Sequence, residues 1–293
     1  MKGDNAMAND YVILSDSACD MTPETLDSWG VQTLPLLFRF DGTEEDLPDG
    51  ALDGPTFYGR MRAGEVSKTS AQTIDAYADL FRPYLADGKD VFFLAFSSGL
   101  SSTFHNAELA AEDVMSEFPG RRVVIMDGLS ASAGQGLLLC LVVRKRGEGA
   151  TLDELTAYTE SIRLHVCHWF TVDDLVYLKR GGRISAATAL VGGMLQIKPI
   201  LHMDNAGHLV SVSKVRGRKA SIQALFDKYT STCTDKSLPV FISHGDAPAD
   251  AAALADMIVG AGGPTPASVY IGPVIGSHSG PGTLSLFFVG SER

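Results

Sequence analysis

Three short apolar runs in the first half of the chain restrict the fold most strongly. YVILSDS (11–17), VFFLAFSS (91–98) and RVVIMDG (122–128) show no polar alternation, and each ends in small polar residues before a helical pattern. Such runs are typical of strands buried on both faces, as in parallel sheets covered by helices. The sequence therefore predicts an α/β fold, with ligand-binding residues at the carboxyl ends of the strands.

The second half of the chain predicts a mixed sheet. After a helical stretch at 152–164, a hairpin pairs 196–203 with 207–215 and turns at Asp204 to Gly207. The other expected elements are helices at 172–181, 185–192, 217–232 and 248–260, and strands at 238–246, 267–272 and 283–290.

The length of 293 residues exceeds what one hydrophobic core usually organises. We therefore expect two domains. Residues 1–166 form an N-terminal parallel sheet covered by helices, and residues 167–293 form a C-terminal mixed α/β sheet domain. We expect the ligand site between the two domains.

Composition excludes several classes of function. The formal net charge of −11 disfavours nucleic acid as a partner. The four cysteines lie far apart without a CxxC pair, the first ten residues lack an apolar signal region, and no apolar run has the length of a membrane span. These features predict a cytoplasmic protein with reduced thiols.

Catalytic signatures are also missing from the sequence. It contains no GxGxxG after a strand, no GxxxxGK[ST], no HExxH and no GxSxG. The segment HVCH (165–168) offers two histidines and one cysteine, an incomplete metal site, so we expect no metal.

Hydroxyl-rich stretches occur where strands give way to helices. One such stretch alone is best interpreted as a helix cap, but there are four: SDSACD (15–20), SKTSAQT (67–73), FSSGLSSTFHNA (96–107) and DGLSASAGQG (127–136). Hydroxyls and free backbone N–H groups at helix N-termini favour an anionic head group, and uncharged hydroxyls are typical of a carboxylate bound for orientation.

Two further residues stand out near glycines. His278 lies in SHSGPGT (277–283), where exposed N–H groups beside an imidazole could hold an oxyanion, although a histidine that satisfies a turn is an equally good interpretation. Arg183 lies in LKRGGRIS (178–185), which is either a solvated helix end or a contact for a phosphate or an acidic partner.

These motifs together closely resemble the DegV family of bacterial fatty-acid-binding proteins. The resemblance runs in order from about Val12 to Val289. It rests on SDSACDMTPE, KTSAQT, FSSGLSSTFHNA, DGLSASAGQGLLL, LVYLKRGGRIS, LVGGMLQIKPIL and IGPVIGSHSGPGTLSLFFVG. The sequence departs from the family at Ala71–Gln72–Thr73, where QPS is frequent, and at Ser102, where glycine is common.

The resemblance implies a long-chain fatty acid held between two domains, with no other cofactor. Its carboxylate would be hydrogen-bonded by Thr69, by one or more of Ser97, Ser98 and Ser101, and by His278. The family also implies a partner, a separate ATP-using fatty acid kinase subunit that makes acyl phosphate from the presented acid. Peripheral membrane contact during ligand exchange is compatible with this function.

Two alternatives use the same residues. A serine-histidine hydrolase or acyltransferase would combine Ser98 or Ser101 with His278, but no acidic third member is evident. A phosphoryl-transfer subunit would use Arg183 and Lys198 without a nucleotide motif. For the tail we expect apolar walls near Leu190, Val191, Met194, Leu195, Ile197, Phe93, Phe96 and Phe104.

Overall fold

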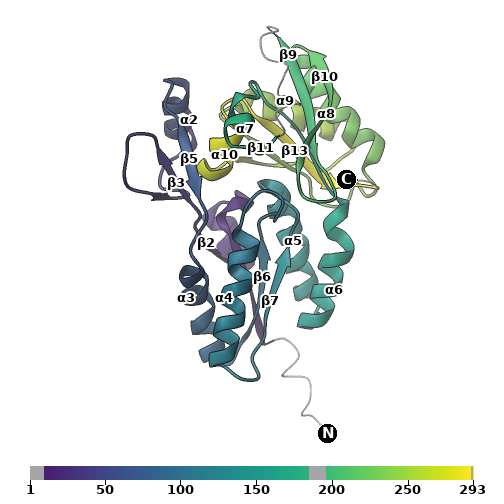
Figure 1. Ribbon diagram of the computed structural model, residues 1–293. Coiled ribbons are helices and arrows are strands. Elements are labelled where there is room, and N and C mark those ends of the chain that lie inside the picture. Colours follow the sequence, from purple (N-terminus) through teal and green to yellow (C-terminus); the bar gives the residue numbers. More distant parts are fainter. Residues whose placement is uncertain (1–9, 185–195, 292) are drawn as a thin grey trace.

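The computed structural model describes residues 10–184, 196–291 and 293. A four-stranded parallel sheet, in the order β2-β1-β6-β7, forms the lower part of the molecule (Figure 1). The three apolar runs become its three longest strands, as predicted. Its strands are β1 (Tyr11–Asp16), β2 (Gln32–Leu34), β6 (Asp90–Ala95) and β7 (Val123–Asp127).

Helices cover both faces of this sheet, which explains why its strands lack polar alternation. One face packs on α3 and α4 through side chains such as Tyr77, Phe81 and Phe93. The other face packs on α5 through Phe92, Leu94 and Leu138. The helices of this part are α1 (Pro23–Trp29), α3 (Ile74–Ala86), α4 (Thr103–Glu117), α5 (Ala133–Gly147) and α6 (Leu152–Ile162), with 3-10 turns η1 (Ser17–Cys19) and η2 (Arg163–His165).

A six-stranded mixed sheet, in the order β10-β9-β8-β13-β11-β12, forms the upper part (Figure 1). Only β11 and β12 pair in parallel, and β9 and β10 form the predicted hairpin. The α/β fold with a parallel and a mixed sheet is thus confirmed. The strands are β8 (Val166–Thr171), β9 (Ile197–Met203), β10 (Leu209–Arg216), β11 (Phe241–His244), β12 (Ala267–Tyr270) and β13 (Leu284–Val289).

The helices of the upper part are α7 (Val176–Arg180), α8 (Arg218–Thr232), α9 (Pro248–Gly260) and α10 (Pro273–Ser279). The helix predicted at 185–192 lies outside the described residues. We did not predict α10, because its glycines and serines suggested a loop. The signals for it are nevertheless present: Pro273 occupies the first turn, and Gly280 at φ 81° ends the helix.

A third, small sheet was also not anticipated. It has the order β4-β3-β5 and lies beside α10, with α2 next to it (Figure 1). Phe57 and Tyr58 of α2 pack against Ile271 and Val274 from the C-terminal half. The elements are β3 (Leu37–Phe40), β4 (Leu47–Pro48), β5 (Ser67–Ser70) and α2 (Gly54–Arg62). The division into two domains near residue 166 stays a prediction.

No helix within the described ranges is long and apolar enough to cross a membrane.

Candidate functional site

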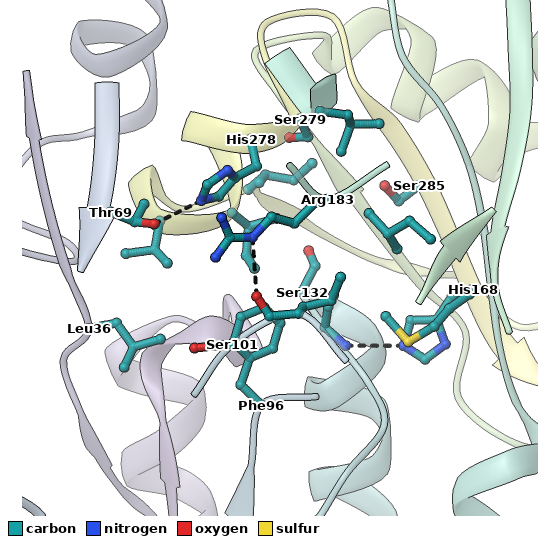
Figure 2. A pocket seen from close by; sticks show the side chains of 18 of the residues that line it. Leu36, Thr69, Phe96, Ser101, Ser132, His168, Arg183, His278, Ser279 and Ser285 are labelled. Atoms are coloured by element: carbon teal, nitrogen blue, oxygen red, sulfur yellow. Dashed lines mark hydrogen bonds between the residues drawn. The ribbon is translucent and has the colours of Figure 1, made fainter. Parts of the chain in front are cut away.

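A cavity of about 160 Å³ lies where the two halves of the chain meet. Side chains from both halves line it, and most of its wall is apolar (Figure 2). The apolar lining includes Leu36, Phe96, Leu100, Phe170, Leu178, Met203, Leu209, Ile271, Val274, Ile275 and Phe287. A cavity of this kind accepts a hydrocarbon group, so its few polar side chains decide how a ligand is oriented.

Thr69 and His278 form a polar pair on this wall. The Oγ1 of Thr69, on β5, lies 2.8 Å from the Nε2 of His278, on α10 (Figure 2). The two residues are 209 positions apart in sequence, so the fold alone brings them together. Both side chains line the cavity. The pair can therefore offer an O–H or N–H donor to a ligand oxygen.

Gly181, the first of the two adjacent glycines in the LKRGGRIS motif, leaves room for the His278 ring. A Cβ at this position would collide with Nδ1 of His278. Nδ1 itself is buried and has no hydrogen-bond partner among the described residues. The imidazole is thus held between Gly181 and Thr69, with its direction set by packing on one side and a hydrogen bond on the other.

Arg183 is the cation of the site. It lines the cavity, where its Nε donates to the Leu100 carbonyl at 3.1 Å and its Nη1 donates to the Gly181 carbonyl (Figure 2). Within the described ranges it forms no ion pair with a carboxylate, and burial lowers the pKa of its guanidinium. A half-buried arginine that has no counter-ion among the described residues favours an anionic ligand.

The protein's own environment keeps His278 uncharged at neutral pH. Burial, followed by the nearby charge of Arg183, lowers the pKa of its imidazole to about 4. A ligand carboxylate would favour the protonated form of His278. That form requires an anion close enough to offset both burial and Arg183.

The predicted serines do not all reach the cavity. Ser101 lines it, with its Oγ 2.9 Å from the Oγ1 of Thr103. Ser97 is fully buried elsewhere, because its hydroxyl donates to the Gly207 carbonyl at 2.9 Å and so joins the two halves of the chain. Ser98 is exposed and outside the lining. The turn after β6 therefore points successive serines in different directions.

Further hydroxyl residues line the cavity besides Thr69 and Ser101. Ser102 lines the cavity at the position where the family commonly has glycine. Ser132 and Ser279 belong to the hydroxyl-rich motif DGLSASAGQG and the glycine-rich motif SHSGPGT, whereas Ser285 lies in the apolar strand β13, where a single serine is no signal. The full set of additional hydroxyl residues is Ser70, Ser102, Ser132, Ser279, Thr283 and Ser285.

His168, from the HVCH segment, also lines the cavity but is fully engaged. Its Nδ1 lies 2.8 Å from the Val166 carbonyl, and its Nε2 accepts from the Ala131 N–H at 3.3 Å (Figure 2). Burial lowers the pKa of this imidazole well below its usual range. Across the described residues no group of His, Cys, Asp and Glu side chains is placed to hold a metal ion.

Comparison with known proteins decides the family. The protein-family model described as "Uncharacterised protein, DegV family" matches residues 10–291 of the sequence. The chain belongs to the DegV family. It is 36% identical over 286 residues to a DegV domain-containing protein of Clostridium perfringens, covering 97% of this chain and 98% of that protein.

Solved DegV structures share the fold. A DegV lipid-binding protein from Thermotoga maritima is 28% identical, with a TM-score of 0.85 over 97% of this chain and 99% of the other. A stearic-acid-binding protein from Eubacterium ventriosum is 26% identical, with a TM-score of 0.85 over 94% of this chain and 97% of the other. The first of these proteins is described as lipid-binding, and the second as binding stearic acid.

Of the four expected tail-wall residues that the structure describes, only one lines the cavity. Phe96 lines the cavity, whereas Phe93 is fully buried in the core between β6 and α3, and Phe104 packs against the same core. Ile197 is half-buried at the start of β9 and does not line the cavity. Leu190, Val191, Met194 and Leu195 lie outside the described residues.

The geometry does not favour a serine hydrolase. Nε2 of His278 faces the Thr69 hydroxyl, and no described serine is hydrogen-bonded to this imidazole. Ser101 is paired with Thr103 instead, and Ser98 lies outside the cavity. Without a serine-histidine contact, the arrangement lacks the activated nucleophile that acyl transfer needs.

Proposed function

We propose that this DegV protein binds a long-chain fatty acid, with the carboxylate at the polar end of the cavity and the tail along its apolar wall. The observation that carries this proposal is the Thr69–His278 pair beside Arg183, on the wall of a mostly apolar cavity. Thr69, Ser101 and His278 supply hydrogen bonds to the carboxylate, and Arg183 supplies the opposite charge.

The tail and the head group contribute different amounts to the free energy of binding. About fifteen methylenes buried at ~0.8 kcal/mol each contribute on the order of 12 kcal/mol before association costs. A neutral hydrogen bond to the head group contributes only about 1 kcal/mol. The tail therefore sets the affinity, and the polar residues set the orientation.

The volume of the cavity adds a geometric requirement. A pocket of about 150 Å³ accommodates a benzene-sized group, so the 160 Å³ present here holds the carboxyl end and the first carbons of a tail. A complete long-chain acid then requires the cavity to widen on binding. Exchange of the acid with a membrane through peripheral contact fits such a widening.

The second part of the proposal is presentation of the acid to a separate ATP-using kinase subunit. The chain contains none of the common nucleotide motifs, so ATP would come from the partner. A carboxylate held in a fixed orientation is what a phosphoryl-transfer partner needs. Arg183, which has no counter-ion in the part of the chain that the structure describes, would stabilise the charge that develops on the acyl phosphate.

The first test is to extract the purified, never-delipidated protein with organic solvent and to identify the released acids by mass spectrometry. We expect one fatty acid per chain. Thr69→Val and His278→Gln should each weaken retention by roughly 1–3 kcal/mol, because each removes a hydrogen bond to a charged group. Thr156→Val, on α6, is the matched control and should retain the acid like the wild type.

No lipid after purification and none after soaking would refute the carrier function. Equal retention by all three variants would refute the assignment of Thr69 and His278 while leaving fatty-acid binding in place. ATP binding by the isolated chain would favour the phosphoryl-transfer alternative over a separate kinase.

A further inference from the structure

The first turn of α10 rests on two carboxylates from the other half of the chain, buried Asp20 and half-buried Asp49. Asp20 Oδ1 accepts the N–H of Gly272 at 2.9 Å, and Asp49 Oδ1 accepts the N–H of Val274 at 3.2 Å. A Cβ at Gly272 would lie 2.9 Å from Asp20 Oδ1 and 3.2 Å from Asp49 Oδ1. The close approach therefore requires a residue without a side chain at this position.

The remaining oxygens of the two carboxylates are also held. Ser132 donates its hydroxyl to Asp20 Oδ2, and Ser17 donates its hydroxyl to Asp49 Oδ2 at 2.8 Å. Ser132 itself lines the cavity, and so does Leu36, whose N–H donates to Ser17 Oγ at 2.9 Å. The carboxylate pair thus connects the helix that carries His278 to the opposite wall of the cavity.

The pair carries its charge without compensation. Neither carboxylate has a cationic partner among the described residues. Burial raises the pKa of Asp49 to about 6, and burial together with the charge of Asp49 raises the pKa of Asp20 well above its usual range. At neutral pH the docked helix therefore confines negative charge that water would otherwise solvate.

Other titratable groups face the same region. Asp16, Cys19 and Tyr58 are fully buried near the pair, and burial raises the pKa of each, that of Asp16 to about 6. The Tyr58 hydroxyl donates to the Ile271 carbonyl at 2.9 Å. At the other end of α10 lie His278 and Arg183. The protonation of all of these groups affects a rate measured at any one pH. The contribution of Asp20 and Asp49 must therefore be obtained by comparing variants with the wild type.

We propose that Asp20 and Asp49 are positioning residues that dock α10, and with it His278, against the opposite cavity wall, and that their charge promotes release of the bound acid. This inference rests on the proposed fatty-acid function. The docked state is most favourable below the ordinary carboxyl pKa, where both groups are neutral. Its advantage is lost as the pH rises through the raised pKa values, because parting α10 from the pair lets water solvate the two charges.

The test measures release of a fluorescent fatty acid, cis-parinaric acid, from the full-length protein into excess albumin between pH 5.0 and 7.5. Asp49→Asn keeps the shape and an oxygen acceptor but removes the charge. The ratio of the wild-type release rate to the Asp49→Asn rate should rise about tenfold over this range, as expected for a pKa displaced from 3.8 to about 6. His278 and the carboxyl group of the probe titrate in both proteins and cancel in the ratio.

Two further variants complete the test. Asp27→Asn removes an exposed charge on α1. The ratio of the wild-type release rate to the Asp27→Asn release rate should therefore not change with pH. Ser17→Ala removes a hydrogen bond that stabilises the charged form of Asp49, so its release curve should move to higher pH. This second shift does not depend on whether the aspartate variants fold.

The outcomes separate this inference from the function on which it rests. If the wild type fails to bind cis-parinaric acid, the proposed function fails. If the wild type binds it, two results would overturn only this inference. One is a ratio of wild-type to Asp49→Asn release rates that stays as flat with pH as the ratio for Asp27→Asn. The other is a Ser17→Ala release rate with the same pH dependence as the wild type, because the carboxylates would then not control release.

Discussion

At the scale of single residues, the environment of His278 makes a prediction about pH. Its pKa, lowered to about 4 by burial and Arg183, lies below the ordinary value of 6.5. The stability contributed by the neutral imidazole is therefore complete above pH 6.5 and is lost as the pH falls toward 4. Relative to His278→Gln, the ligand-free wild type should lose about 2 kcal/mol of unfolding free energy between pH 7 and pH 5.

Urea unfolding of both proteins at each pH measures this difference. Comparison with the variant is essential, because Asp16, Asp20 and Asp49 have raised pKa values and change stability in the opposite direction over the same range. A stability difference that does not vary with pH would mean that His278 is solvated rather than buried.

Single residues also mark the limit of sequence reasoning. Thr69 and His278 were identified through a family resemblance, and they do meet in the structure. Ser97 and Ser98 share the motif FSSGLSSTFHNA with Ser101 but do not line the cavity. A sequence pattern does not show in which direction a turn points each side chain. Ser285 gave no signal, since one serine in an apolar strand is ordinary.

At the scale of elements, the contact between α7 and α10 depends on Gly181. Gly181→Ala would place a Cβ against the His278 ring, so α7 and α10 must move apart and the Thr69–His278 hydrogen bond is disturbed. We expect a stability loss of about 1–3 kcal/mol, as for overpacked sites, together with weaker retention of a fatty acid. Gly59→Ala on α2 meets no atom within 4 Å and should be neutral or stabilising.

Thermal unfolding and fatty-acid retention of both variants provide the measurement. Full retention by Gly181→Ala would show that the imidazole is free to move, contrary to the packing described above.

Elements also differ in how well their sequences identify them. The buried strands β1, β6 and β7 were predicted because each is a short apolar run that ends in small polar residues before a helical pattern. The helix α10 was missed because only seven residues form it. It is stabilised less by its own sequence than by Asp20 and Asp49, which lie more than two hundred residues away.

At the scale of the whole molecule, α5 joins the two large sheets. Its residues from Ala133 to Val142 are buried on all sides, because Phe92 and Leu94 of the parallel sheet pack on one side and Phe241 and Phe287 of the mixed sheet pack on the other. A helix that is apolar all round is typical of a protein interior rather than of a surface layer. The run LLLCLVV (137–143) within this helix is apolar throughout, in keeping with this burial.

The shared helix predicts that the two sheets unfold together. Leu138→Ala, at a fully buried position of α5, should cost about 2–5 kcal/mol through the lost contacts and the cavity left behind. Leu109→Ala, on the exposed side of α4, removes the same atoms from a position that is 36% exposed and should cost much less. Calorimetry on the ligand-free protein should give one transition that moves as a whole in Leu138→Ala. If instead two transitions separate and only one moves, the sheets are independent, and α5 belongs energetically to the sheet whose transition shifts.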